Sequence, residues 1–422
     1  MSVPIEALRN EVREIVGPDH LRRATSPDAV DGVQPRAVVE PGSANEMARV
    51  LRLADSRGLS VAPRGGGTKL GWGNPPRCLD LVLSTSRLER IIEHAWADMT
   101  ATVESGCTVA RFQKALAEHG QRLALDPLWP ERATIGGILA TNDSGTLRLR
   151  FGSLRDLIIG ITIALPNGSL ARSGGKVVKN VAGYDLPKLL TGSFGTLGVI
   201  TEATFRLHPL PRSVRSISFN AGSNEAMDRL VLAVLDSELA TAALQVRARS
   251  DGPPLRVDVR FEGVAASLDA QTRKMLELAE GAKQIDGDPA VWDAREALWA
   301  GTESALVCKV SVLPAQMGAL CYMVQRATKS SGLGWKLVVQ AVGVGLLRVD
   351  GTDELALSAL SAMRSELKES GGSLVILHCP PEKKEQANVW GETSDALPLM
   401  IHVKEQFDPG GTLNPGRFVG GI

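Results

Sequence analysis

Three glycine-rich segments at separated places in the chain constrain its fold more than any other feature. They span residues 63–68, 130–145 and 179–198. Consecutive glycines let backbone N–H groups converge on one point, where they can bind an anion. Any one of these segments could be a simple set of turns. Together they predict a site for a long ligand with several polar sections, such as a dinucleotide.

The first segment reads Pro63-Arg64-Gly65-Gly66-Gly67-Thr68. It has neither the G-x-x-x-x-G-K-[ST] spacing of a P-loop nor a G-x-G-x-x-G fingerprint, so both of those nucleotide-binding folds are excluded. Thr68 adds a hydroxyl donor to the backbone donors of the loop.

Size and charge narrow the class of protein. A chain of 422 residues needs two or three lobes. Lys+Arg and Asp+Glu both number 47, and this balance argues against a nucleic-acid partner. No apolar run is long enough to span a bilayer. The N-terminal helix pattern carries acidic residues, unlike a signal peptide. We therefore expect a cytoplasmic protein with no direct membrane span, which could still be peripheral to a membrane through partners.

The five cysteines form no C-x-x-C pair and are expected to be small buried hydrophobes. An iron–sulfur cluster in this chain is therefore not expected, and single-electron carriers would have to come from another chain.

Secondary-structure signals are clearest in the first half of the chain. Ser43 is placed to cap a helix that Gly58 ends, and Asn167-Gly168 predicts a tight hairpin. A proline pair at 209–211 is a plausible hinge, and residues 215–400 alternate strand and helix patterns. That alternation predicts an α+β, ferredoxin-like lobe. No internal repeat is visible in the sequence.

The motifs PRGGGT, ATIGG, GYDLPKLLTGSFGTLGVIT and FDPGGTLNPGR resemble the vanillyl-alcohol-oxidase or p-cresol-methylhydroxylase (PCMH) type of FAD proteins. The resemblance is greatest to FAD-linked 2-hydroxy-acid dehydrogenases and glycolate oxidase subunits. It implies an α+β chain with a two-subdomain PCMH-type FAD-binding fold and an α+β (ferredoxin-like) cap domain. The implied division is a helical segment at 1–29, the FAD domain at 30–212, the cap at 213–398 and a C-terminal return at 399–422.

The resemblance also implies which residues contact FAD. The first loop would hold the pyrophosphate, the second would follow the ribityl chain and ring, and the remaining positions would complete the adenosine and flavin contacts. These residues are Pro63, Arg64, Gly65, Gly66, Gly67, Thr68, Pro130, Thr134, Gly136, Gly137, Asp143, Ser144, Gly198, Val199, Ile200 and Asn414. Relatives with covalent flavin often carry histidine in place of Thr68, so we expect FAD to be non-covalent.

The resemblance implies fewer residues for substrate binding than for cofactor binding. Arg295 and Lys309 match positions that bind a substrate carboxylate, although without the family they would be a helix-surface cation and a strand-edge charge. The metal motifs of the relatives are absent from 340–348 and 376–379, where Leu377 replaces a glutamate. No metal site is expected. His378 could act as a base, or could be a satisfied, partly buried residue.

This pattern, with FAD loops kept and metal ligands lost, resembles the FAD-binding E subunits of bacterial glycolate oxidases. It implies partners: a metal-motif-bearing FAD subunit and an iron–sulfur subunit, acting on a small 2-hydroxy acid such as glycolate, which becomes glyoxylate. Two alternatives stay open. The chain could be a self-sufficient FAD-dependent D-2-hydroxy-acid (D-lactate-like) dehydrogenase, or a degenerate, non-catalytic assembly subunit.

Overall fold

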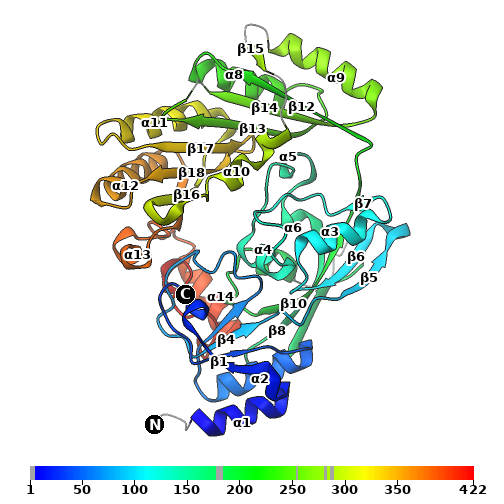
Figure 1. The fold of residues 1–422 in the computed structure, drawn as a ribbon, viewed down its shortest axis with the longest axis vertical. Coiled ribbons are helices and arrows are strands. Elements are labelled where there is room, and N and C mark those ends of the chain that lie inside the picture. The colour runs from blue at the N-terminus through cyan, green and yellow to red at the C-terminus, as the bar shows by residue number, and fades with distance from the viewer. Residues whose placement is uncertain (1–4, 177–183, 253–254, 280–282, 286–288) are drawn as a thin grey trace. The chain divides into compact units, whose positions relative to one another are not determined.

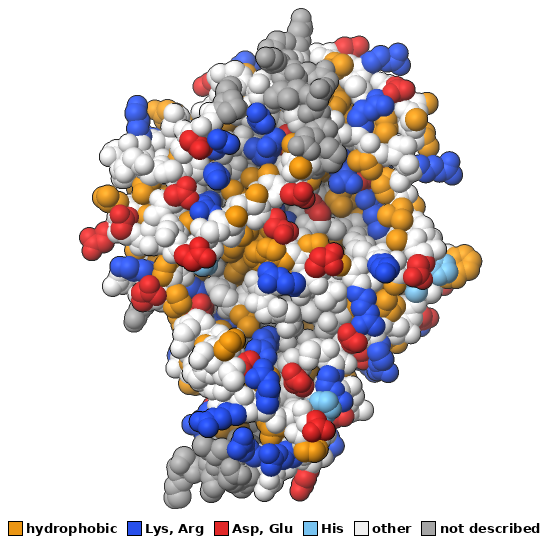
Figure 2. Space-filling model, in the orientation of Figure 1, with side chains coloured by type: hydrophobic (Ala, Val, Ile, Leu, Met, Phe, Trp, Pro, Cys, Tyr) orange, Lys and Arg blue, Asp and Glu red, His pale blue; other side chains and the backbone are white. Residues whose placement is uncertain are grey.

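A computed structural model of the chain describes residues 5–176, 184–252, 255–279, 283–285 and 289–422 (Figure 1). Part of the third glycine segment, 179–183, lies outside the described residues. The chain divides into two units. Unit 1 comprises residues 1–144, 153–210 and 392–422, and unit 2 comprises residues 145–152 and 211–391. Acidic and basic side chains are interspersed over the face shown in Figure 2, in keeping with the zero net charge.

The first sheet of unit 1 has the strand order β1-β2-β4-β3. Its strands are β1 (Leu21–Arg23), β2 (Ala37–Val39), β3 (Val61–Arg64) and β4 (Leu81–Ser84), accompanied by α1 (Ile5–Val16) and α2 (Ala44–Ser56). β2 and β3 both pair parallel to β4. The predicted helix cap is confirmed, because the Ser43 side chain accepts a hydrogen bond from the Glu46 N–H. Met47 and Leu51 of α2 are fully buried against Val39, Val61 and Leu83 of the sheet.

The second sheet of unit 1 has the strand order β5-β6-β10-β8-β9. Its strands are β5 (Ile91–Ala95), β6 (Thr100–Glu104), β8 (Ile158–Ala164), β9 (Leu170–Gly174) and β10 (Val199–Arg206). The hairpin predicted at Asn167-Gly168 is confirmed, since β8 and β9 pair antiparallel on either side of it. Phe112 and Phe205 lie in the core beneath this sheet. Nearby are α3 (Val109–Ala117), α4 (Ile135–Thr141), α6 (Leu154–Leu157), α7 (Leu186–Leu190) and the short pair β7 (Gln121–Arg122) and β11 (His208–Pro209).

Unit 2 is built on one eight-stranded sheet with the order β15-β12-β14-β13-β17-β18-β16-β19. Its elements are β12 (Ser213–Asn220), α8 (Asn224–Leu235), β13 (Thr241–Arg249), β14 (Arg256–Gly263), α9 (Ala265–Leu278), β15 (Lys283–Ile285), α10 (Ala294–Ala297), β16 (Ala305–Ser311), α11 (Met317–Lys329), β17 (Trp335–Gln340), β18 (Val344–Asp350), α12 (Glu354–Glu369), β19 (Ser373–His378) and α13 (Pro381–Ala387). α5 (Arg148–Phe151) joins them.

The order of these elements reveals a repeat that the sequence does not show. From β12 to β15, and again from β16 to β19, the chain follows the pattern βαββαβ. Each half also has the ferredoxin-like strand order 4-1-3-2, and the halves join where β13 pairs antiparallel with β17. The four long helices share one core with a single face of the sheet.

The last segment returns to unit 1. α14 (Leu397–Phe407) precedes the stretch 408–416, and Leu413 forms a parallel bridge with Val61 of β3. The backbone of Val61 donates to the Thr412 carbonyl (2.8 Å) and accepts from the Asn414 N–H (2.9 Å). The C-terminal segment thus lies directly beside the strand that leads into the first glycine loop. Among the described helices, none has both the length and the apolar character that a membrane crossing requires.

Candidate functional site

The glycine segments, far apart in sequence, line a single pocket in unit 1. Its wall consists of Pro63, Gly65, Gly66, Gly67, Thr68, Lys69, Leu70, Thr134, Gly137, Ala140, Thr141, Phe194, Asn414 and Arg417. All three segments and the C-terminal return therefore contribute. The pocket has a volume of only about 70 Å³, so it can hold one small section of a long ligand. Of the residues predicted to bind the cofactor, Pro63, Gly65, Gly66, Gly67, Thr68, Thr134, Gly137 and Asn414 are among these residues.

The first loop needs glycine because its backbone lies against the second loop. A Cβ added to Gly66 would lie 1.8 Å from the Arg132 carbonyl oxygen, and one added to Gly65 would lie 2.1 Å from Thr134 Oγ1. Gly67 has φ +72°, a left-handed conformation that side chains disfavour. No side chain fits at Gly65 or Gly66, and the φ of Gly67 disfavours one there, so the backbone itself forms this part of the pocket wall.

The loop also presents hydrogen-bond donors. Within the part of the chain that the structure describes, the N–H groups of Gly66, Gly67 and Thr68 donate to no partner. Thr134 caps α4 by accepting a hydrogen bond from the Gly137 N–H (3.3 Å). Such an array of donors suits an anionic group, for example a pyrophosphate.

Asn414 supplies an acceptor to the lining of the pocket. Its residue is 3% exposed, and its Nδ2 donates to the Phe194 carbonyl at 2.7 Å. Its Oδ1 is buried with no hydrogen-bond partner among the described residues. A buried acceptor without a donor costs free energy, so this oxygen is suited to receive a ligand N–H or O–H.

A buried ion pair holds the segment that carries Asn414. Lys404 of α14 pairs with Asp408 and donates to the carbonyls of Thr196 (2.8 Å) and Leu413 (2.9 Å). Burial lowers the pKa of Lys404, whereas the charge of Asp408 opposes that shift. Asp408 in turn accepts from the N–H groups of Thr412 and Leu413. The position of Asn414 therefore depends on this pair.

A second buried pair connects the first two glycine segments. Lys69 Nζ lies 3.2 Å from Asp143 Oδ2, and both side chains are less than 5% exposed. The Lys69 ammonium also lies over the rings of Trp72 and Trp129. Asp143, which was predicted to contact the cofactor, pairs with Lys69 and accepts a hydrogen bond from the Leu128 N–H (2.9 Å).

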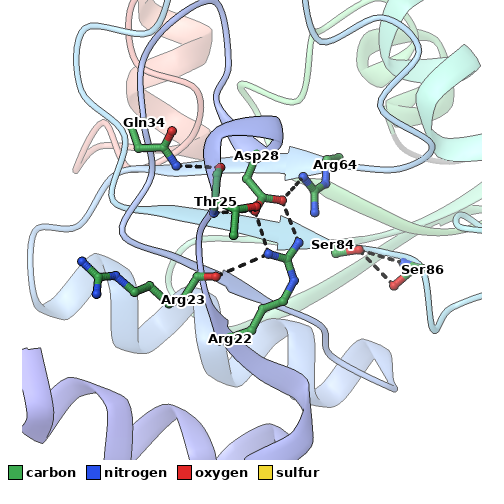
Figure 3. A network of polar contacts seen from close by, with 8 residues as sticks. All are labelled: Arg22, Arg23, Thr25, Asp28, Gln34, Arg64, Ser84 and Ser86. Atoms are coloured by element: carbon green, nitrogen blue, oxygen red, sulfur yellow. Dashed lines mark hydrogen bonds and ion pairs between the residues drawn. The ribbon is translucent and has the colours of Figure 1, made fainter.

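Arg64 is held by a carboxylate from the short helical turn between β1 and β2 (Figure 3). Its Nη1 donates to Asp28 Oδ1 at 2.8 Å, and Arg22 donates to both oxygens of the same carboxylate. Thr25 adds hydrogen bonds from its N–H and its hydroxyl. The bonds from Arg22, more than any other contact, hold the pKa of Asp28 far below its ordinary range. Arg64 does not line the pocket, so the geometry gives it a supporting position.

The other predicted cofactor residues are not among those that line the pocket. The Pro130 carbonyl accepts from the Ala110 N–H (2.9 Å), and Ser144 Oγ accepts from the Leu154 N–H (3.4 Å). Gly136 has Ser105 against it, since an added Cβ would lie 2.8 Å from Ser105 Cβ. Gly198 packs near Ile163, and Val199 and Ile200 are buried in β10.

Sequence reasoning missed Lys69, Leu70, Ala140, Thr141, Phe194 and Arg417, which also line the pocket. Most of them adjoin predicted residues, so proximity in sequence was the available signal. Arg417 is fully enclosed, and burial lowers its pKa to about 10. It donates to the carbonyls of Leu70 and Trp72, thereby holding the loop that follows the glycines.

The predicted substrate residues all lie in unit 2. Arg295 is 9% exposed, so the interpretation as a helix-surface cation is wrong. Lys309 lies on β16, between β18 and β19, and is not at the edge of the sheet. His378 pairs with Val307, two residues from Lys309, so both side chains project from one face of the sheet. The structure brings these two residues to the same region.

His378 has a structural partner. Its Nε2 lies 2.9 Å from the Thr302 carbonyl oxygen, and its ring is edge-on to Trp299. A carbonyl can only accept, so Nε2 carries a proton. The apolar stretch before and within β18 is core, since Val339, Ala341 and Leu347 are almost fully buried. Among the residues described, no three His, Cys, Asp or Glu side chains gather where they could hold a metal ion.

The FAD binding domain family matches residues 35–174. The chain is 31% identical to glycolate oxidase subunit GlcD of Bacillus subtilis over 64% of this chain and 58% of that protein. It is 37% identical to D-lactate dehydrogenase of Archaeoglobus fulgidus over 43% of this chain and 42% of that protein. The chain thus spans about half the length of these two relatives. It is 28% identical to the mitochondrial cytochrome D-lactate dehydrogenase of Arabidopsis thaliana, over 91% of this chain and 73% of that protein.

Solved structures agree on the fold. A p-cresol methylhydroxylase with substrate bound superposes with a TM-score of 0.75 at 16% identity, over 98% of this chain and 96% of that chain. An alkyldihydroxyacetonephosphate synthase superposes with a TM-score of 0.75 at 19% identity, over 98% and 85%. At these identities the likeness concerns the fold alone, and it confirms the expected α+β, PCMH-type architecture.

Proposed function

Because residues 35–174 belong to the FAD binding domain family, we propose that this chain is an FAD-binding subunit of a 2-hydroxy-acid oxidoreductase of the glycolate oxidase type. In this proposal it oxidises, or helps to oxidise, a small 2-hydroxy acid such as glycolate, and electrons pass to partner subunits. The observation that carries the proposal is the convergence of three glycine segments and Asn414 on one pocket. The names of relatives, glycolate oxidase subunit and D-lactate dehydrogenase, support the substrate class.

The pocket suits one polar section of FAD, its pyrophosphate, and the rest of the cofactor would extend beyond it. The N–H groups of Gly66, Gly67 and Thr68 would hold its pyrophosphate, and Asn414 Oδ1 would accept a hydrogen bond from an N–H or O–H elsewhere in FAD. The proposal of non-covalent FAD rests on Thr68, whose hydroxyl stands where covalently bound relatives often carry a histidine. When bound, FAD supplies hydride and electron transfer, and the protein contributes position and electrostatics.

The residues of unit 2 offer groups that could bind the carboxylate of a substrate. Arg295 and Lys309 can attract a substrate carboxylate, because a guanidinium and an ammonium both pair with carboxylates. His378, however, carries a proton at Nε2, which it donates to Thr302. It cannot accept a substrate proton at that atom. A base role for His378 would therefore have to use Nδ1. The partners in this proposal, a second, metal-bearing FAD subunit and an iron–sulfur subunit, rest on the similarity to a glycolate oxidase subunit.

The test is spectroscopic. The chain is purified, desalted and examined for flavin absorbance before and after anaerobic addition of glycolate or D-lactate. We expect bound flavin that stays oxidised with substrate alone and is reduced once the partner subunits are added. Bleaching by substrate alone would instead support the self-sufficient dehydrogenase. An absence of flavin bands, even after incubation with FAD, would contradict the proposal and favour an assembly subunit.

A further inference from the structure

A second pocket lies in unit 1, and it shares no residue with the glycine-lined one. It has a volume of about 710 Å³ and is lined by Arg9, Val12, Leu21, Arg23, Ala24, Thr25, Ser26, Gln34, Pro35, Arg36, Ala37, Asp80 and Leu81. These residues come from α1, from the end of β1 and from the starts of β2 and β4. The glycine loop follows the end of β3, which runs parallel to β4. The two pockets therefore lie at opposite ends of the sheet.

The lining combines positive charge with an apolar floor. Three arginines, Arg9, Arg23 and Arg36, face a single acid, Asp80. That acid is already engaged, because it pairs with Arg36 (3.1 Å) and accepts from the N–H and hydroxyl of Ser60. The hydroxyl of Ser26 adds a further donor, whereas that of Thr25 already donates to Asp28. In Figure 2 several Lys and Arg side chains gather at the lower end of the face, where Figure 1 places α1 and β1.

Strand geometry separates the two arginines of β1. Successive side chains of a strand point to opposite sides. In Figure 3, Arg22 points toward Asp28, whereas the side chain of Arg23 points away from that network. Apart from its backbone carbonyl, Arg23 makes no polar contact among the described residues. Its guanidinium is thus available to a ligand, while that of Arg22 is committed to the fold.

The walls are held in place without a ligand. Gln34 Nε2 donates to the Thr25 carbonyl (2.8 Å), which joins the two loops that face each other. Thr25 is fixed to Asp28 through its N–H and hydroxyl. The Arg36 N–H donates to the Asp80 carbonyl (2.8 Å), which fixes the starts of β2 and β4. A preformed pocket binds more tightly because fewer groups must be ordered on binding.

We propose that this pocket binds a small organic anion, in which a phosphate or carboxylate pairs with Arg23 and Arg36 and an apolar group rests on Ala24, Ala37 and Leu81. Guanidinium groups pair with such oxyanions through two parallel hydrogen bonds. The volume is in the range of sites for small organic ligands, about 300–1,000 Å³. The excess of arginine excludes a cationic ligand.

The test is calorimetric titration of the full chain with phenyl phosphate, and with inorganic phosphate and phenol as partial probes. We expect phenyl phosphate to bind at one site per chain and each partial probe to bind at least about tenfold more weakly, because each lacks one half of the recognition. Arg23→Glu should weaken phenyl phosphate about tenfold or more. Because Arg23 supports no other side chain, this variant should fold as the parent does.

Two comparisons complete the design. Arg273→Glu changes an exposed arginine of α9 in unit 2 and should leave the affinity for phenyl phosphate unchanged. Ala24→Phe fills the apolar floor and should weaken phenyl phosphate more than it weakens inorganic phosphate. Equal affinity in the parent and Arg23→Glu, or no measurable binding to the parent, would overturn the proposal. Flavin absorbance reports on FAD in the glycine-lined pocket, and calorimetry reports on phenyl phosphate in the second pocket. Loss of flavin binding can therefore be distinguished from loss of phenyl phosphate binding.

Discussion

At the residue scale, the function of the candidate site rests on positions where no side chain fits. Replacing Gly66 with alanine would put a Cβ 1.8 Å from the Arg132 carbonyl oxygen. The two glycine segments would have to separate, at a cost of about 1–3 kcal/mol. We expect Gly66→Ala to lose most of its flavin on desalting. The visible absorbance of the flavin that remains bound to the protein measures this loss.

Gly222→Ala is the matched control. No atom lies within 4 Å of a Cβ added there, and the backbone is not in the left-handed region. This variant should keep the parental flavin content. Full flavin occupancy in Gly66→Ala would show that the first loop does not contact the cofactor.

The cysteines give a second prediction at this scale. The expectation that all five are buried is wrong for Cys78, which is exposed, whereas Cys107, Cys308, Cys321 and Cys379 are buried. Burial raises the pKa of Cys107 to about 11 and those of Cys308 and Cys321 to about 12. Because the thiolate is the reactive form, an alkylating reagent at pH 8 should modify Cys78 alone in the native chain. Mass spectrometry of peptides would show this, and rapid labelling of a second cysteine would contradict it.

Single residues also show which features of the site could be predicted from the sequence. The glycines of the pocket were predictable because only glycine permits that backbone. Lys69 and Asp143 were not recognised as a pair, since 74 positions separate them and only the fold brings them to 3.2 Å. Likewise, the orientation of His378 toward Thr302 depends on the segment that precedes β16.

At the scale of elements, the Asp28 network joins β1 to the end of β3. Because its pKa is held below the ordinary 3.8, the charged form of Asp28 stabilises the fold at every pH above about 4. That contribution is lost as the pH falls through the folded-state pKa. We expect Asp28→Asn to lower the free energy of unfolding by about 2 kcal/mol between pH 5 and 8. The difference in free energy of unfolding between Asp28→Asn and the parent should become smaller below pH 4.

Urea unfolding of both proteins from pH 3 to pH 8 measures that difference. Asp156→Asn offers a comparison, because Asp156 caps the short helix α6 without any arginine bound to it. A difference between Asp28→Asn and the parent that stayed constant down to pH 3 would show that the charge of Asp28 is not what stabilises the network.

Individual elements were largely predictable, but the arrangement of unit 2 was not. Alternating apolar residues predicted the strands β12, β13 and β14, and apolar residues at helical spacing predicted the helices α8 and α9. The duplication remained hidden because the two halves share strand order and not side chains. Strand order is set by pairing between residues distant in sequence, such as Gln245 with Gln340, and no local pattern records it.

At the scale of the whole molecule, cofactor binding should act on one unit. The glycine-lined pocket belongs entirely to unit 1. FAD at about 100 times its Kd should raise the free energy of unfolding of that unit by about 2.7 kcal/mol. Hydrogen exchange should slow for amides of β3 and α4 and stay unchanged for β13 and β17 of unit 2. Equal slowing in both units would show that the cofactor binds elsewhere or couples them.

The join between β13 and β17 has a consequence for how unit 2 could have arisen. Either half alone would end in a long strand whose backbone donors and acceptors have no neighbour, and exposed edges of this kind promote self-association. Two separate half-length chains could therefore pair through this edge as a homodimer, with a stability that depends on concentration. Covalent linkage makes the same pairing intramolecular, at a high effective concentration. Unit 2 is thus consistent with a fused and diverged dimer, in which the two copies became free to acquire different surfaces.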